Sequence, residues 1–101
     1  MARKIIWSRR AQNDRIGIFT YWNKRNKSKV YSRKLNSLYN QAAKFVATNP
    51  NAGSTTTREN IRVKFVSHFA LIYKVTQFEI QMLSIFDSRQ SPEKLEEILG
   101  E

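Results

Sequence analysis

Three basic residues within one short stretch are the first candidates for chemistry. Arg62, Lys64 and Lys74 lie in RVKFVSHFALIYKV, where apolar and polar residues alternate. Cationic side chains can stabilise the charge that builds up on a phosphate during cleavage, and aromatic rings can stack on an exposed base. The stretch therefore predicts a surface that contacts phosphate. The alternative is a sheet face that is simply exposed to solvent and uses Lys and Arg for solubility.

Few other residues could support catalysis. His68 is the only histidine and cysteine is absent, which excludes disulfides and thiolate metal sites. We predict no metal and no cofactor, and we interpret His68 as a solvated turn residue and Tyr73 as a core residue. Towards the C-terminus, Asp87 and Arg89 could pair and hold a loop, or Arg89 could reach a polyanion.

The charge distribution indicates a polyanionic or acidic partner. The formal net charge is +10. Residues 1–48 hold twelve Lys and Arg residues and one acidic residue, Asp14, whereas residues 49–101 hold six Lys and Arg and seven acidic residues. This charge exceeds what solubility requires, and it would speed encounters with nucleic acid or an acidic protein.

The length of 101 residues suits a single domain over residues 1–101. The N-terminal apolar run is too short for a signal peptide, and no long apolar stretch follows. We therefore expect a soluble, cytoplasmic protein without membrane contact.

The first half of the chain predicts a strand followed by two helices. Residues 4–7 favour a short strand, and Ser8 can cap a helix over residues 9–24. Ser28 can cap a second helix that ends before Pro50. The apolar stripe of the second helix is expected to comprise Tyr31, Leu35, Leu38, Ala42 and Phe45, with Val46 beside it.

The second half predicts a three-stranded antiparallel meander and a short helix. We place a three-residue turn at 66–68, because it pairs Phe65 with Phe69 and brings the large apolar side chains of the hairpin to one face. Residues 80–86, apolar on both faces, favour an interior strand, and Ser91 can cap a short helix. The expected fold is α+β. The two long helices pack on one sheet face through Trp22, Leu35, Leu38 and Phe45, against Ile61, Val63, Leu71 and Tyr73, and the other face presents Arg62, Lys64 and Lys74.

Four segments together resemble the RelE/ParE family of bacterial toxins from type II toxin–antitoxin systems. IIWSRRAQNDRIGIFTYW is similar to the family's opening, and TNP to the end of its second helix. IRVKFVSHFALIYKV resembles its central hairpin, and IQMLSIFDSRQSPEKL its last strand and exit. The resemblance covers residues 4–95 and rests on the combination of segments.

The resemblance implies growth inhibition in one of two ways, cleavage of messenger RNA on the ribosome or poisoning of DNA gyrase. It also implies an acidic antitoxin that neutralises the toxin, in a complex that could be a heterotetramer. By position, Arg62, Lys64 and Arg89 match basic residues of the ribonuclease branch. Its usual arginine in the second hairpin strand is replaced by Ala70.

These implications leave three hypotheses. Because Ala70 replaces the arginine, we favour a toxin that binds gyrase or a related target without chemistry of its own. The alternatives are a ribosome-dependent ribonuclease that uses Arg62, Lys64 and Arg89, and a simple basic nucleic-acid-binding module.

Overall fold

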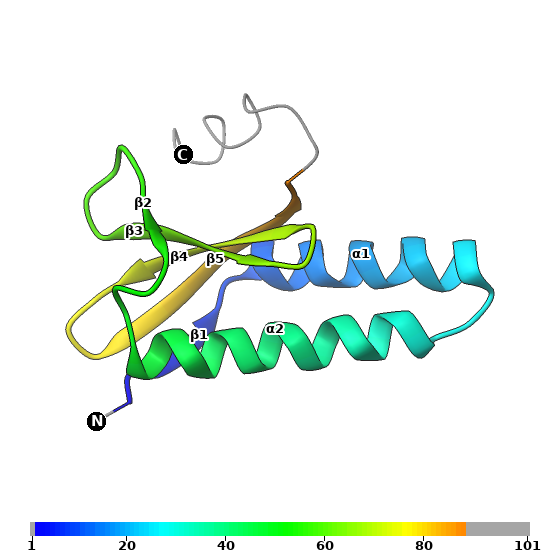
Figure 1. Cartoon of the computed structure of the whole chain (residues 1–101), viewed down its shortest axis with the longest axis horizontal. Helices are drawn as coiled ribbons and strands as arrows, with labels where there is room; N and C mark the ends of the chain where they lie inside the picture. The colour runs from blue at the N-terminus through cyan, green and yellow to red at the C-terminus, as the bar shows by residue number, and fades with distance from the viewer. Residues whose placement is uncertain (1, 89–101) are drawn as a thin grey trace.

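The chain folds into one mixed sheet and a pair of long helices (Figure 1). The computed structural model describes residues 2–88, so Arg89 and the short helix predicted after Ser91 lie outside the described residues. The elements are β1 (Lys4–Trp7), α1 (Arg9–Asn26), α2 (Val30–Thr48), β2 (Ser54–Thr55), β3 (Ile61–Val66), β4 (Phe69–Val75) and β5 (Glu79–Asp87).

The sheet has the strand order β1-β5-β4-β3-β2. Strand β1 runs parallel to β5, and the other neighbours are antiparallel. The α+β fold, the meander and the interior position of the last strand are confirmed. Strand β2, which pairs with β3 at Thr55 and Arg62, was missed because a two-residue strand in a Ser/Thr-rich loop has no detectable period.

Helix α1 begins where the sequence predicts, and it runs to Asn26, two residues beyond the predicted end at Lys24. The Ser8 hydroxyl accepts a hydrogen bond from the Ala11 N–H at 3.0 Å, as a capping residue should. Lys27 ends the helix in the left-handed conformation, with φ at 52°.

Helix α2 presents a different stripe to the sheet from the one predicted. Leu35, Tyr39 and Val46 are buried, whereas Phe45 is 49% exposed and Leu38 is half-buried. The predicted stripe placed Phe45 in the core and omitted Tyr39, and both assignments are wrong. The small residues Ala43 and Ala47 are also buried in the core.

The β3–β4 hairpin has a two-residue turn at Ser67 and His68, so the predicted three-residue turn is wrong. Ser67 has a φ of 55°, and Lys64 lies opposite Leu71. The prediction assumed that only one face of the hairpin is apolar. Strand β4 is central and buried on both faces, so this assumption fails.

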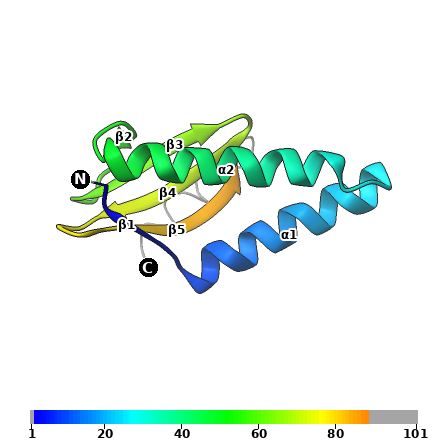
Figure 2. The ribbon, with the colours of Figure 1, turned by 90° about the horizontal axis from the view of Figure 1, so that it is seen from below.

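Both helices cover the same face of the sheet (Figure 2). The main core lies between them and the sheet, and it includes Leu35, Tyr39, Leu71, Tyr73 and Met82. A second, smaller cluster lies on the other face; its buried members are Val63, Ala70 and Ile72, with Ile61, Leu83 and Phe86 packed against them. The sheet is therefore apolar on both sides.

Candidate functional site: the hairpin cations and the groove along α1

Arg62 holds the turn between α2 and β2 in place. Its Nη1 donates to the carbonyl oxygens of Gly53 at 2.8 Å and Asn51 at 3.2 Å. Hydrogen bonds from a charged group are stronger than neutral ones. Arg62 thus has a structural task that the sequence did not reveal.

Tyr73 fastens the same turn from the core. Its buried hydroxyl donates to the Pro50 carbonyl and accepts from the Gly53 N–H, both at 2.9 Å. A Cβ on Gly53 would lie 2.6 Å from this hydroxyl oxygen and 2.8 Å from the Val63 carbonyl oxygen, so only glycine fits. Burial raises the pKa of Tyr73, whereas the Gly53 hydrogen bond and Arg62 act in the opposite direction. The prediction that Tyr73 is a core residue is confirmed.

The other two hairpin cations lie on opposite faces of the sheet. The half-buried Lys64 shares the helix-covered face with Arg62, and its Nζ lies 5.2 Å from the centroid of the Phe45 ring. Lys74 is exposed and pairs with Ile61, which places it on the other face. The predicted common surface of Arg62, Lys64 and Lys74 is therefore wrong, because the two-residue turn shifts β4 by one position relative to the predicted register.

Ala70 occupies the position where the resemblance implies an arginine. It is fully buried beside Val63 and Ile72, on the face opposite Arg62 and Lys64. The observed register thus separates this position from the two cations of β3. His68 is exposed in the turn, as predicted, and its carbonyl oxygen accepts hydrogen bonds from Ser88.

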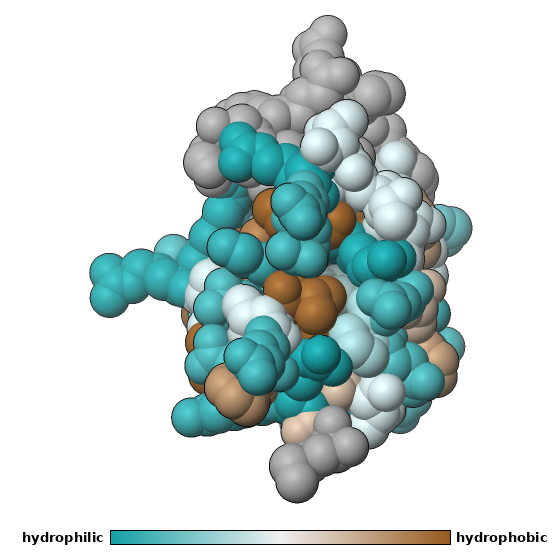
Figure 3. Space-filling model, turned by 90° about the vertical axis from the view of Figure 1, so that its left-hand side faces the viewer, coloured by the Kyte–Doolittle hydropathy of each residue, from teal (hydrophilic) through white to brown (hydrophobic). Residues whose placement is uncertain are grey.

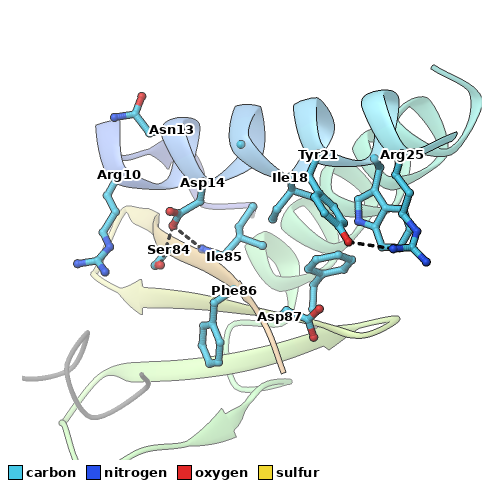
Figure 4. A pocket seen from close by; sticks show the side chains of 13 residues that line it. Arg10, Asn13, Asp14, Ile18, Tyr21, Arg25, Ser84, Ile85, Phe86 and Asp87 are labelled. Carbon is cyan, nitrogen blue, oxygen red and sulfur yellow. Dashed lines mark hydrogen bonds between the residues drawn. The ribbon is translucent and has the colours of Figure 1, made fainter. Parts of the chain in front are cut away.

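A groove of about 630 Å³ runs along α1 beside the outer edge of β5 (Figure 4). Side chains from successive turns of α1 line one wall, and the ends of β4 and β5 line the other. Its lining residues are Arg10, Asn13, Asp14, Gly17, Ile18, Tyr21, Trp22, Arg25, Phe69, Ser84, Ile85, Phe86 and Asp87.

Charge and apolar surface are distributed unevenly along this groove. In Figure 4, Arg10 lies near one end and Arg25 near the other, with Ile18 and Tyr21 between them on α1. The Arg25 guanidinium donates to the Tyr21 hydroxyl at 3.2 Å and lies 5.7 Å from the Trp22 ring centroid. The lining therefore combines apolar side chains with arginines near both ends and with the carboxylates of Asp14 and Asp87.

Asp14 joins the two walls of the groove. Its carboxylate accepts hydrogen bonds from the Ser84 hydroxyl at 2.7 Å and the Ile85 N–H at 3.0 Å. Strand β5 extends beyond its pairing with β1, which ends at Trp7 and Met82, and the ladder with β4 shifts register at this point. Asp14 thus satisfies a backbone N–H that β1 does not reach.

The sequence prediction missed this groove. One signal was available, because Asp14 is the only acidic residue in the first 58 positions. An isolated carboxylate in so basic a segment indicates a specific hydrogen-bonding task.

Tyr39 lies in the main core between the helices and the sheet. Among the described side chains, its hydroxyl is the one buried polar atom without a hydrogen-bond partner. Burial, followed by the influence of Tyr31 and Asp87, raises the pKa of Tyr39, so the side chain stays neutral. It packs at 5.9 Å from Phe69 and 6.1 Å from Phe19, measured between ring centroids, and therefore acts as a core aromatic.

Neither a metal site nor a membrane span is present in the described part of the chain. Within residues 2–88, His, Asp and Glu side chains form no cluster of three or more that could hold a metal ion. Neither helix of that part combines the length and the apolar character needed to cross a membrane.

Comparison with solved structures identifies a relative in fold. A chain of a structure described as the "Chromosomal ParDE TA system from P. aeruginosa" matches with a TM-score of 0.72 and 20% sequence identity. The match covers 85% of this chain and 96% of that chain. The two chains share one fold. The fold implied by the resemblance to RelE/ParE toxins is thereby confirmed. No protein-family model matches the sequence, and neither does any curated protein at a significant level.

Proposed function

We propose that this chain is the toxin of a bacterial type II toxin–antitoxin pair and that it inhibits growth by binding its target. The observation that carries this proposal is the fold shared with a chain of the ParDE system over most of both chains. The ParE-like target is DNA gyrase or a related replication component.

Two features of the hairpin favour binding over RNA cleavage. Ala70 offers no charge for a phosphate, and it lies on the face opposite Arg62 and Lys64. Arg62 is already bonded to two backbone carbonyls. Removing one well-placed cationic donor typically lowers a rate by about 10²–10³-fold. The alternative, a RelE-like ribonuclease, would need Lys64, Lys74 or Arg89 to replace the missing arginine.

The antitoxin is proposed to place an acidic, amphipathic segment in the groove along α1. From Arg10 to Arg25 a helix rises roughly 23 Å, which several turns of a bound helix would match. The apolar side chains Ile18 and Trp22 suit the partner's apolar face, and the exposed Arg25 suits its carboxylates. Association should slow as salt rises, since the charges are screened.

Gly17 allows this groove to be blocked without disturbing the core. A Cβ placed on Gly17 meets no atom within 4 Å, so a larger side chain there can enter the groove. Gly17→Trp should abolish neutralisation by the antitoxin while toxicity remains. Gly17→Ala is the matched control, and it should be neutralised normally and be more stable, because alanine favours helix.

The target is tested with purified protein in two parallel assays. We expect inhibition of gyrase supercoiling and no codon-positioned cleavage by primer extension on translating ribosomes. Strong cleavage by the unmodified chain would overturn the binding mechanism and favour the ribonuclease. If expression causes no growth defect, and the short acidic reading frame expected beside the gene is absent, the toxin proposal itself fails.

A further inference from the structure

The turn that joins α1 and α2 carries the densest positive charge of the described chain. We call residues 24–34 the hairpin tip. In Figures 1 and 2 this end of the helical pair extends beyond the sheet. No acidic residue occurs between Asp14 and Glu59 in the sequence. The exposed cations of the tip are Lys24, Arg25, Lys27, Lys29, Arg33 and Lys34.

Three features of the tip oppose local helix stability. Lys27 adopts the left-handed conformation, which glycine or asparagine normally occupies. Lys29 is the N-cap of α2 and makes no side-chain capping bond. Arg33 and Lys34 follow near the positive end of the helix dipole, where acidic residues are favoured. A position that breaks several local rules at once is a candidate for a functional constraint.

The composition of the tip suits phosphate better than a protein surface. Protein interfaces have an apolar or aromatic centre and are depleted in lysine. At the tip, Val30 is the one large apolar side chain with most of its surface exposed, at 72%. Asn26 and Ser28 add exposed polar groups of the kind that contact phosphate oxygens.

The aromatic residues below the tip are already packed against one another. The Trp22 and Tyr31 rings meet edge to face at 4.9 Å between centroids, and both residues are half-buried. Tyr21 packs on Trp22 at 5.1 Å, and its hydroxyl accepts a hydrogen bond from Arg25. These rings do not form the open row of stacking platforms that single-stranded nucleic acid requires.

We infer that the hairpin tip binds the phosphodiester backbone of duplex nucleic acid, without reading the bases. The contacts are the long cationic side chains of the tip, which reach phosphates on the surface of a duplex. The tip adjoins the groove along α1 proposed for the antitoxin and shares Arg25 with it, but the other cations of the tip lie outside the groove. The inference does not depend on the proposed toxin function, because a chain without toxicity could still bind a duplex through these cations.

The test compares two fourfold charge-neutralised variants of the full chain. The tip variant is Lys24→Gln, Lys27→Gln, Lys29→Gln and Lys34→Gln. The control variant is Lys4→Gln, Arg9→Gln, Lys44→Gln and Arg58→Gln, which removes the same charge from exposed positions elsewhere. Affinity for labelled 20-base-pair DNA and RNA duplexes is measured by fluorescence anisotropy over a salt series, and circular dichroism verifies that both variants fold.

We expect the tip variant to lose about tenfold or more in affinity and the control variant to lose much less. The slope of log affinity against log salt should fall by about 0.9 for each lysine that had neutralised a phosphate of B-form DNA. A difference between the DNA and RNA duplexes would identify which duplex form the tip prefers.

Two outcomes would overturn the inference. Equal losses in the two variants would show that only the net charge of the chain attracts the duplex. Displacement of the duplex by polyglutamate, as effective as by unlabelled duplex at equal charge concentration, would assign the tip to acidic proteins. Gyrase and growth assays on the same variants report separately on the toxin proposal.

Discussion

The two ends of α1 are built in opposite ways. At its start, Ser8 accepts a hydrogen bond from the Ala11 N–H and donates one to the Leu83 carbonyl at 2.9 Å, and Asp14, six residues later, accepts one from β5. At its end, Lys27 is held in a left-handed conformation among exposed cations. Residues of α1 near the sheet thus form hydrogen bonds that stabilise the fold. Residues at the far end of α1 carry charge instead, in a conformation that lowers the stability of the helix end.

The same contrast appears between the two ends of the whole molecule. Figure 3 shows the end opposite the hairpin tip, where hydrophobic surface interrupts the hydrophilic surface. Phe78, in the turn between β4 and β5, is 73% exposed. The tip, in contrast, exposes mainly Lys and Arg. A partner with an apolar surface would therefore bind at the end that exposes Phe78, whereas a partner with phosphate groups would bind at the hairpin tip.

The largest expected effect comes from removing the carboxylate at the sheet end of α1. Asp14→Ala should lower the free energy of unfolding by about 2 kcal/mol, because the Ile85 N–H and the Ser84 hydroxyl lose a charged acceptor. Urea denaturation measures the change. Asn13→Ala, an exposed neighbour that also lines the groove, is the control, and an equal loss in both variants would contradict the anchoring role of Asp14.

Two serines allow a direct comparison: Ser8 caps the start of α1, and Ser28 lies in the turn between α1 and α2. Ser8→Ala should lower the free energy of unfolding by about 1 kcal/mol, since the Ala11 N–H and the Leu83 carbonyl both lose their partner. Ser28→Ala, which removes a 3.2 Å bond from the Val30 N–H at the exposed tip, should have a clearly smaller effect. Thermal melts followed by circular dichroism would refute the contrast if the two variants lost stability equally.

Removing the backbone strain at Lys27 should stabilise the chain, whereas the preceding substitutions destabilise it. Lys27→Gly is expected to raise the free energy of unfolding by about 1 kcal/mol, because glycine adopts a φ of 52° without a Cβ clash. Lys27→Ala removes the same charge but keeps the strained conformation. If alanine stabilised the chain as much as glycine in denaturant melts, charge repulsion rather than backbone strain would be the cause.

The smallest expected effect concerns the helix dipole. Lys29→Asp should stabilise the chain by about 0.5 kcal/mol, because an acidic residue then caps the N-terminus of α2. Lys44→Asp makes the same change in charge near the C-terminus of the helix and should destabilise it. Midpoints of thermal unfolding at low salt distinguish the two. If the midpoint shifted in the same direction in both variants, the effect on stability would come from the net charge of the chain and not from the position of the residue on the helix.

Local patterns predicted the elements well, because capping and periodicity act over a few residues. Ser8 capped α1 as expected, and β5 was correctly placed in the interior of the sheet. The choice of register failed because it depends on what lies on both sides of β4. In the sequence, an alanine such as Ala70 indicates neither burial nor exposure, yet Ala70 is fully buried on the second apolar face.

The candidate site was predicted less well than the fold. Arg62 looked like a phosphate ligand because its type and position suit one, but its bonds to Gly53 and Asn51 join residues that no local pattern relates. The groove formed by α1 and β5 depends on a contact between segments about 70 positions apart, such as that between Asp14 and Ser84. Sequence patterns of short range carry no information about such a contact.

The parallel pairing of β1 with β5 has a consequence for how the chain folds. Strand β1 pairs with a strand about 75 positions later in the sequence. The hydrogen bond between Ser8 and Leu83 spans the same sequence separation. Closing so long a loop has an entropic cost that local contacts do not offset, and sheets with distant pairings form slowly. During synthesis the α1–α2 hairpin can form early, but the sheet cannot close before β5 has emerged. A prematurely terminated chain would thus lack the completed sheet, so any function of the folded chain would require synthesis through β5.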